Sequence, residues 1–251
     1  MTFPAGLPLL DCHAHIAPDV TDRQIERLGD VHVVAMTRSL AEANYASTRS
    51  DRQLTWAVGA HPGRPDALAQ YNPTLFRSVA SRFAVVGEVG LDRRGVREDQ
   101  ERVFDDVLTA CVDLPVLISV HSTGRTREVV ERVEQHALKG VVLHWFLGAQ
   151  DLCTRAVKAG AYFSVNSAMP GDLISAFPRD RILPETDFPA KRVGAVAPGD
   201  THALEVLLAE IWNEPVEHVR PNLWRNLRTI SLASGAIDKF PEALADVLLS
   251  A

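Results

Sequence analysis

The chain has 251 residues, 46% of them hydrophobic, so it can bury the core of one α/β barrel or of two small domains, and we take one domain as the expectation. Its net charge of −6 gives no general attraction to a polyanion, which argues against binding along an extended DNA duplex and leaves nucleic-acid contact to local positive charge or bound metal. Three scattered cysteines, an N-terminus unlike a secretory signal, and no apolar run near the roughly 20 residues that span a bilayer predict a cytoplasmic protein without a membrane partner.

Short apolar runs alternate with helical patterns along the chain. Several runs are apolar at nearly every position, as expected for parallel strands covered on both faces. Between them, residues 21–29 begin with cap-type residues and end at a glycine, and residues 98–112 carry hydrophobic side chains at helical spacing. The eight predicted strands fall within residues 7–16, 31–37, 55–62, 83–92, 115–123, 140–148, 161–168 and 181–189. Eight strand–helix units predict a (β/α)8 TIM barrel.

The helical pattern is weakest in two connections. Residues 63–79 contain two prolines, and residues 169–178 leave room for only a short helix. From about residue 215 the pattern predicts two terminal helices that close the barrel. With no linker, repeat or low-complexity segment, residues 1–251 are expected to form one metal-dependent hydrolase barrel.

Polar side chains gather where the predicted strands end. In a barrel of this kind the C-terminal strand ends form one face, where catalytic residues collect. The remaining histidines, His32, His136, His202 and His218, fall at strand starts or on helices, and we expect structural or surface roles for them. The side chains at the strand ends that can bind a metal or transfer a proton are His13, His15, His61, Glu88, Asp92, His121, His144 and Asp187.

The opening motif "DCHAHI" places two histidines two residues apart. Residues with this spacing on a strand point to the same face, so His13 and His15 can bind one ion together. A single histidine at a strand end is more often a satisfied polar residue, but six strands delivering such groups to one rim favour a metal site. Imidazole and carboxylate ligands together suit Zn, Mn, Ni or Fe, with Mg also open, and the set is large enough for two divalent ions if one carboxylate bridges them.

Six motifs in order, "DCHAHI", "GAHP", "VGEVGLD", "SVHST", "VLHWFLG" and "PETDFP", span residues 11–189. This series resembles the TatD-family metal-dependent hydrolases, TatD-like deoxyribonucleases within the amidohydrolase-like superfamily of barrels. The cadence "LHWFLG…YFSVNSAM…PRDRILPETDFP" is also similar to the TatD-like nucleases of Qat antiphage gene clusters. That likeness implies antiviral defence and protein partners encoded in the same cluster.

The resemblance implies a role for each matching position. A metal-bridged hydroxide would attack phosphorus, as in a two-metal phosphodiesterase, with Glu88, Asp187 and His61 as the catalytic residues. His61 would face the scissile phosphate, and Glu185 would support the metal ligands from behind. The implied ligands are His13, His15 and Asp187 for the first ion, Glu88 as the bridge, and His121 and His144 for the second.

The chain departs from the family pattern around the substrate. The usual "HSR" reads "HST", the usual "HCFSG" reads "HWFLG" with Trp145 and Leu147, and the family's "RNEP" stretch after Asp187 is replaced. Arg93 and Arg94 follow the fourth predicted strand, and arginine pairs with phosphate through two parallel hydrogen bonds. The alternative for these arginines is a solvated helix start.

We therefore predict a substrate-binding set of His61, Arg93, Arg94 and Trp145. The expected activity is that of a divalent-metal-dependent phosphodiesterase or deoxyribonuclease acting on DNA ends or single strands. The first alternative is a lactonase or amidase of the wider superfamily, which Glu88 leaves open and the absence of lysine from residues 115–123 disfavours. The second is a non-catalytic subunit of a larger complex, which the complete ligand set disfavours.

Overall fold

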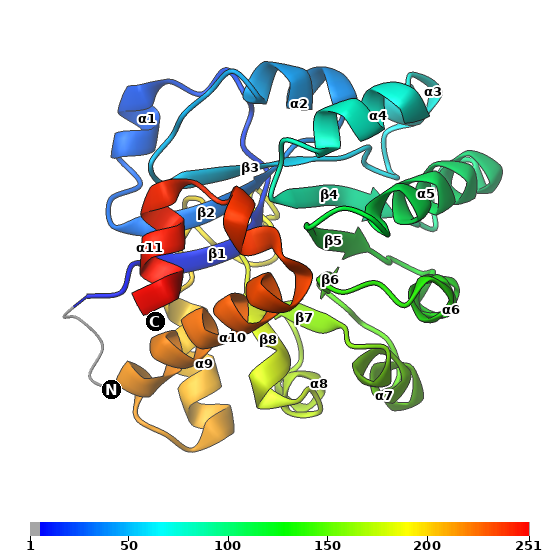
Figure 1. The fold of residues 1–251 in the computed structure, drawn as a ribbon. Helices are drawn as coiled ribbons and strands as arrows, with labels where there is room; N and C mark the ends of the chain where they lie inside the picture. The colour runs from blue at the N-terminus through cyan, green and yellow to red at the C-terminus, as the bar shows by residue number, and fades with distance from the viewer. Residues whose placement is uncertain (1–5, 251) are drawn as a thin grey trace.

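Eight parallel strands form one sheet in the order β1 to β8, as seen in the computed structural model, which describes residues 6–250 (Figure 1). Each strand is hydrogen-bonded to the next along the chain, so every connection crosses over through an outer segment. The predicted TIM barrel is confirmed. The strands are β1 Leu9–Ala14, β2 Val31–Met36, β3 Leu54–Val58, β4 Val85–Gly90, β5 Leu117–His121, β6 Val141–His144, β7 Tyr162–Val165 and β8 Ile182–Pro184.

The ring closes where the chain leaves β1 and β8. The backbone N–H of Asp187 donates to the carbonyl of His13 at 2.9 Å, and the N–H of His15 donates to the carbonyl of Phe188 at 2.8 Å. These bonds hold two stretches of chain, 174 residues apart at His13 and Asp187, side by side at the C-terminal end of the barrel. Three predicted site residues are therefore positioned by the closure itself.

Helices surround the sheet (Figure 1). The predicted helix at residues 21–29 begins at Asp22, with Thr21 and Gln24 forming a capping box. The segment 63–79, where the helical pattern is weak, makes two short helices, and Pro73 begins the second. The outer helices are α1 Asp22–Glu26, α2 Leu40–Ala46, α3 Pro65–Ala69, α4 Pro73–Ala80, α5 Arg97–Cys111, α6 Thr126–His136, α7 Gln150–Lys158, α8 Gly171–Ser175 and α9 His202–Trp212.

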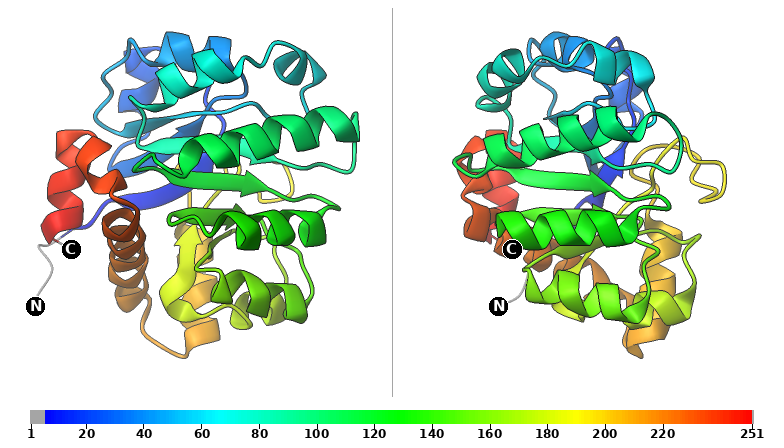
Figure 2. Two further views of the ribbon diagram at one scale, coloured as in Figure 1. Left: turned by 45° about the vertical axis from the view of Figure 1, so that its right-hand side comes forward. Right: turned by 90° about the vertical axis from the view of Figure 1, so that its right-hand side faces the viewer.

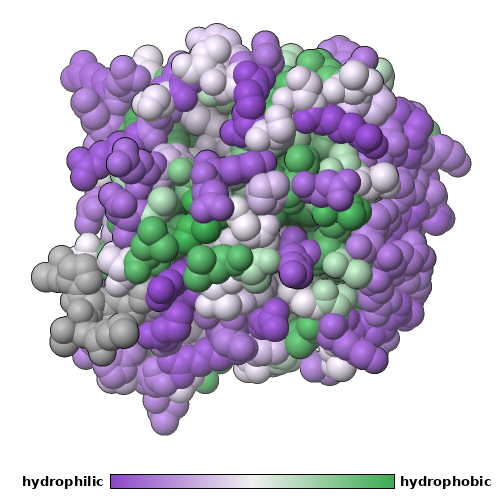
Figure 3. Space-filling view, in the orientation of Figure 1, coloured by the Kyte–Doolittle hydropathy of each residue, from purple (hydrophilic) through white to green (hydrophobic). Residues whose placement is uncertain are grey.

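Two further helices, α10 Val219–Ser234 and α11 Glu242–Ser250, cover the end of the barrel where the strands begin (Figure 2). Fully buried Trp224 of α10 donates from Nε1 to the carbonyl of Pro8 at 2.9 Å. Figure 3 shows this N-terminal face, where hydrophobic side chains gather over α11 within a mainly hydrophilic surface. The C-terminal strand ends are left uncovered by these helices. The short 3-10 helices are η1 Arg179–Arg181, η2 Val216–His218 and η3 Ala236–Lys239.

The hydrophobic core has two layers. The outer layer lies between strands and helices and includes Val33, Val86 and Phe104. The inner layer fills the barrel with residues such as Leu10 and Val34, together with side chains from α10 and α11. Because strand residues alternate between these layers, the alternation decides which polar side chains point into the barrel.

Two register shifts interrupt that alternation at the site. Asp11 pairs with Val33 of β2, and Ala14 pairs with Ala35. Between these two pairs β1 has one residue more than β2, as in a β-bulge. Cys12 belongs to the inner layer, and strict alternation would turn His13 outward. With the shift, His13 instead points into the barrel and contacts Ser119 on β5.

β4 contains a similar register shift. Val86 pairs with Ile118 of β5 and Val89 pairs with Val120, so β4 again has one extra residue between the two pairs. Val85 faces the interior, so regular alternation would place Glu88 on the outside, yet its carboxylate lies inside the barrel. A glycine is needed nearby, because a Cβ on Gly90 would lie 2.1 Å from the carbonyl oxygen of His121. Both shifts aim predicted ligands at one point.

The described residues bear on two of the remaining expectations. Within residues 6–250, no helix combines the length and apolarity required to cross a bilayer. Cys12, Cys111 and Cys153 are all buried and unbonded to one another.

Candidate metal centre

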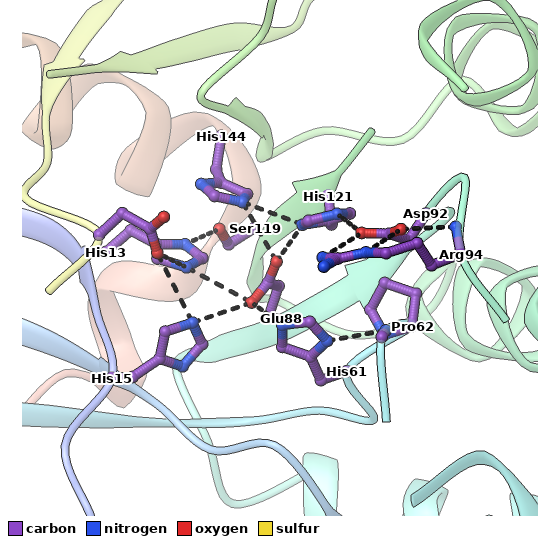
Figure 4. Close-up of polar contacts among 12 residues, drawn as sticks. His13, His15, His61, Pro62, Glu88, Asp92, Arg94, Ser119, His121 and His144 are labelled. Atoms are coloured by element: carbon purple, nitrogen blue, oxygen red, sulfur yellow. Dashed lines mark hydrogen bonds and ion pairs between the residues drawn. The ribbon is translucent and has the colours of Figure 1, made fainter. Parts of the chain in front are cut away.

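The centre of the site is the buried carboxylate of Glu88, with imidazole rings on all sides (Figure 4). Burial opposes its ionisation, but His61, His121 and His144 overcome that effect and hold the pKa of Glu88 well below its usual range. The carboxylate is therefore an anion at neutral pH. Its oxygens lie within ion-pair distance of five histidines, which are His13, His15, His61, His121 and His144.

The surroundings of His13 keep its ring neutral, the form that binds a metal. Its Nδ1 lies 2.8 Å from the hydroxyl of Ser119, and burial lowers its pKa to about 3. In the tautomer that donates from Nδ1 to Ser119, Nε2 offers a lone pair toward Glu88 and Asp187, at 3.7 and 3.8 Å. Nε2 is buried and has no hydrogen-bond partner. An unsatisfied buried nitrogen facing two carboxylates fits a metal ion.

His15 and Asp187 lie beside it, one residue past β1 and three residues past β8. The Nε2 atom of His15 is 3.1 Å from Glu88 and 3.6 Å from Asp187. Asp187 has a left-handed backbone, with φ of 46°, which turns its side chain inward from the loop. Burial raises the pKa of Asp187 to about 6. His13 and His15 approach the same two carboxylates, so the pair can bind one ion together.

His121 and His144 form the other half of the site. The Nδ1 of His121 contacts Glu88, and the Nε2 of His144 is 3.1 Å from Glu88. Behind His121, Oδ2 of Asp92 lies 2.9 Å from Nε2, and behind His144, Oε2 of Glu185 lies 3.4 Å from Nδ1. Carboxylates placed in this way orient metal-binding imidazoles and increase their basicity.

Glu185 is itself held in place. It accepts hydrogen bonds from the hydroxyl of Ser164 and from the side-chain amide of Asn166, the latter at 2.9 Å. Burial opposes its ionisation, but nearby His144 outweighs this and lowers the pKa of Glu185. The structure thus places Glu185 as a charged support behind His144.

His61 differs from the other four histidines. The backbone N–H of Gly63 donates to its Nδ1 at 2.8 Å, so the ring carries its proton on Nε2. Burial lowers the pKa of His61, which keeps the ring neutral. Nε2 lies 3.2 Å from Glu88. A protonated Nε2 cannot bind a metal but can donate a hydrogen bond to an anionic oxygen.

Three residues outside the predicted ligand, catalytic and substrate-binding sets position the site. Asp11 accepts bonds from Thr186 and from the backbone of Gly199, which ties β1 to the chain after β8, and burial raises its pKa to about 6. Asp92 holds His121. Gln100 of α5 accepts from the backbone N–H of Asp92 at 2.9 Å. Gln100 could have been found from the sequence as a polar residue on the buried face of a helix. Asp11 and Asp92 could have been found because they lie in the motifs "DCHAHI" and "VGEVGLD".

An open cavity of about 440 Å³ lies over the metal centre. Of the predicted substrate-binding residues, His61, Arg94 and Trp145 line it. Arg93 does not line it: this side chain is exposed and lies against Gly124. We call this space the rim cavity; it is lined by His15, His61, Glu88, Arg94, His121, Thr123, His144, Trp145, Leu147, Asp187, Pro189, Ala190 and Arg192.

The predicted ligands, with His61 beside them, form three overlapping groups whose nitrogen and carboxylate oxygen atoms lie within 4.8 Å of one another. The described part of the chain thus offers donors for metal binding at the predicted place. The groups are His13, His15 and Glu88; His13, His144 and Asp187; and His61, Glu88 and His121.

Comparison with known proteins gives a family. The sequence model described as TatD related DNase matches residues 10–231. Deoxyribonuclease TATDN3 of Homo sapiens is 28% identical over 220 residues, covering 74% of this chain and 80% of the human protein. The uncharacterized metal-dependent hydrolase YabD of Bacillus subtilis is 22% identical over 204 residues, covering 72% of this chain and 80% of that protein.

Solved structures share the fold. YJJV, a TatD homolog from Escherichia coli K12, superposes with a TM-score of 0.75 at 21% identity, covering 88% of this chain and 97% of that chain. A TatD-family hydrolase from Entamoeba histolytica gives a TM-score of 0.70 at 15% identity, covering 89% of this chain and 97% of that chain. At these identities the likeness concerns the barrel.

Proposed function

The chain belongs to the TatD-related DNase family of metal-dependent hydrolases, and from this membership we propose that it hydrolyses phosphodiester bonds at DNA ends or in single strands. The observation that carries the proposal is the anionic Glu88 carboxylate at the floor of an open cavity, contacted by five histidines. The human relative is named as a deoxyribonuclease, which supports DNA as the substrate.

The donors fit two divalent ions. His13, His15 and Asp187 would hold one ion, His121 and His144 the other, and Glu88 would bridge them. Support comes from the unsatisfied Nε2 of His13 and from Oε2 of Glu88, which also lacks a hydrogen-bond partner. Two such ions supply an activated water and neutralise charge on the phosphoryl oxygens.

His61 would act directly on the substrate. Its Nε2 lies 3.2 Å from Oε2 of Glu88, so it faces the same small region as the ligands. A phosphoryl oxygen entering that region would accept a hydrogen bond from Nε2, which strengthens as negative charge develops. His61 would thereby bind the scissile phosphate and stabilise its transition state.

The rim cavity suits a flexible strand. Its volume of about 440 Å³ lies within the range for small-ligand pockets, large enough for one or a few nucleotides. Arg94 and Trp145 on its walls offer a phosphate partner and a surface on which an unpaired base can stack. No lysine lines this cavity in the described chain, so the carboxylated lysine that bridges metals in many lactonases and amidases has no counterpart.

We further propose a role in antiphage defence beside proteins encoded in the same gene cluster. The support is the cadence of residues 143–189 alone. The neighbouring genes test it: an adjacent ATPase and a nucleoside-modification enzyme are expected, and an isolated gene would contradict the role.

The activity is tested by offering labelled single-stranded DNA and a panel of lactones and amides to the purified protein under Mn²⁺, Mg²⁺ and Zn²⁺. We expect DNA to be cleaved in preference, His61→Ala to slow the reaction, and Asp187→Asn to abolish it. Turnover of a lactone or amide in preference to DNA would overturn the proposal. So would DNA cleavage that survives in Asp187→Asn, because a metal-independent activity would then be present.

A further inference from the structure

Two arginines stand on opposite sides of the rim cavity. Arg94 follows β4 and Arg192 follows β8, and both line the cavity. In a closed ring of eight strands in sequential order, β4 and β8 are four strands apart in either direction. The two guanidinium groups therefore flank the metal centre from opposite edges of its mouth.

Arg94 is held ready for an anion. Its backbone N–H donates to Oδ1 of Asp92 at 2.7 Å, and its Nε lies 3.3 Å from the same oxygen. The side chain is nevertheless 77% exposed, so much of the guanidinium remains open to the cavity. Asp92 in turn contacts His121, which ties the arm of Arg94 to a predicted metal ligand. Preorganisation of this kind lowers the entropy lost on binding.

Arg192, unlike Arg94, has no carboxylate partner among the residues that the structure describes. Its position is fixed by turns, because Ala190 donates to the carbonyl of Asp187 at 2.8 Å and Val193 donates to the carbonyl of Ala190 at 3.1 Å. Its exposed guanidinium makes no ion pair with any carboxylate in residues 6–250. An unpaired cation held at the edge of the cavity is available to an anionic ligand.

The wall between them is apolar. Trp145 and Leu147 follow β6, midway between β4 and β8 around the ring, and Leu147 is 55% exposed. An unpaired base can pack on such a wall while its phosphates reach toward the arginines. The cavity thus offers one apolar side and two cationic edges.

We propose that Arg94 and Arg192 are a two-sided phosphate clamp, each binding one of the phosphates that neighbour the scissile phosphate, on opposite sides of it. The inference rests on the proposed phosphodiesterase function and specifies its substrate. A phosphate over Glu88 lies between the arginines, so a strand crossing the mouth presents its next phosphate to each edge. The preferred substrate then carries a phosphate on both sides of the bond that is cut.

Four thymidine dinucleotides test the clamp: TpT, with only the scissile phosphate, pTpT and TpTp, with one additional end phosphate, and pTpTp, with both. For the wild-type protein, each end phosphate is expected to raise kcat/KM about tenfold, as for a charge-assisted hydrogen bond. Arg94→Gln should erase the benefit of one end phosphate and Arg192→Gln that of the other. For each variant the benefit is taken as the ratio of kcat/KM to that on TpT for the same protein, which separates the lost end-phosphate contact from any change at the metal centre.

The chain provides matched controls beside each arginine. Arg93 and Lys191 carry the same charge, are exposed, and do not line the cavity. Arg93→Gln and Lys191→Gln should retain the benefit of both end phosphates. Elemental analysis should give the same metal content in all four variants, and Arg192→Gln, in an exposed loop, tests the clamp even if Arg94→Gln loses metal.

Failure of the clamp and failure of the proposed function are distinguishable. A wild-type protein that cleaves neither these substrates nor longer single strands lacks the proposed activity. One that cleaves them with no gain from end phosphates, or cuts long strands but not pTpTp, has the activity without the clamp. Equal loss on TpT in both arginine variants would mean that both bind the scissile phosphate, which also overturns the proposal.

Discussion

The two ends of the barrel differ in how their buried polar groups are paired. At the N-terminal end His32 and Asn226 each have their own partners: Nε2 of His32 lies 2.9 Å from the hydroxyl of Thr55, and the side-chain amide of Asn226 donates to the carbonyls of Arg179 and Ile182, both at 2.8 Å. At the rim, five imidazoles share the carboxylate of Glu88.

This difference indicates that the polar groups at the N-terminal end stabilise the fold, whereas those at the rim serve ligand binding. A buried polar group with one well-placed partner contributes to folding, whereas a buried group without a partner costs free energy. Nε2 of His13 and Nδ1 of His15 are buried without hydrogen-bond partners, so the rim is organised around a ligand that the protein must acquire. Substitutions at the two ends should therefore change different measurable quantities.

The largest effect is expected for Glu88→Gln. Glutamine keeps the shape but loses the charge that faces five histidines, so metal binding and turnover should fall well beyond the roughly 100-fold ceiling for a residue behind a ligand. Added metal should also cease to raise the melting temperature, since a ligand stabilises only the state that binds it. Near-normal turnover in this variant would remove Glu88 from the metal centre.

Glu185→Gln should have an intermediate effect. Glu185 lies behind His144, with 3.4 Å between Oε2 and Nδ1, so its charge orients that ring without reaching the substrate. We expect metal affinity, measured by competition with a chelator, to weaken by roughly 10 to 100-fold. Saturating metal should restore most of the turnover. A loss as deep as that of Glu88→Gln at saturating metal would contradict a supporting role.

At the opposite end, Asn226→Ala should reduce stability alone. The change leaves the buried carbonyls of Arg179 and Ile182 without their donor, which should lower the free energy of unfolding by about 2 kcal/mol. Urea denaturation measures this, with the less buried Asn222→Ala on the same helix as control. Metal affinity and turnover of the folded variant should match the wild type. A change in metal affinity would contradict the expectation that Asn226 affects stability alone.

The strand ends of the site could be predicted because their residues follow the regular alternation of inward and outward side chains. In β5 and β6, His121 and His144 continue the inward positions of Leu117 and Val142. Their chemistry is thus readable from spacing. The barrel was equally predictable, because a short apolar run marks each of the eight strands.

The rest depends on contacts between distant segments. His13 and Glu88 point inward only because register shifts interrupt β1 and β4, and regular alternation from Cys12 and Val85 would send both outward. Arg192 lies 98 residues beyond Arg94 in a loop without a family motif, and only ring closure brings it over the same cavity. His13 and Glu88 were predicted from their strand-end positions and family motifs, but the register shifts that turn them inward and the position of Arg192 have no local sequence signal.

The smallest expected effect concerns His32, whose ring lies inside the N-terminal end of the barrel. Burial lowers its pKa from 6.5 to about 4, so at pH 5.5 the unfolded chain binds a proton there that the folded chain does not. Stability contributed by the neutral ring is complete above pH 6.5 and falls between pH 6.5 and 4. The loss at pH 5.5 should be about 1 kcal/mol relative to pH 7.5.

His32→Gln isolates this contribution, because glutamine has an uncharged amide that can donate to Thr55 and takes up no proton. Urea denaturation of the wild type and the variant, both freed of metal, should be compared at pH 7.5 and 5.5. The rim histidines titrate equally in both proteins, so the difference in pH dependence belongs to His32. Parallel loss of stability in the two proteins would show that acid sensitivity arises at the rim and that the N-terminal end has no part in it.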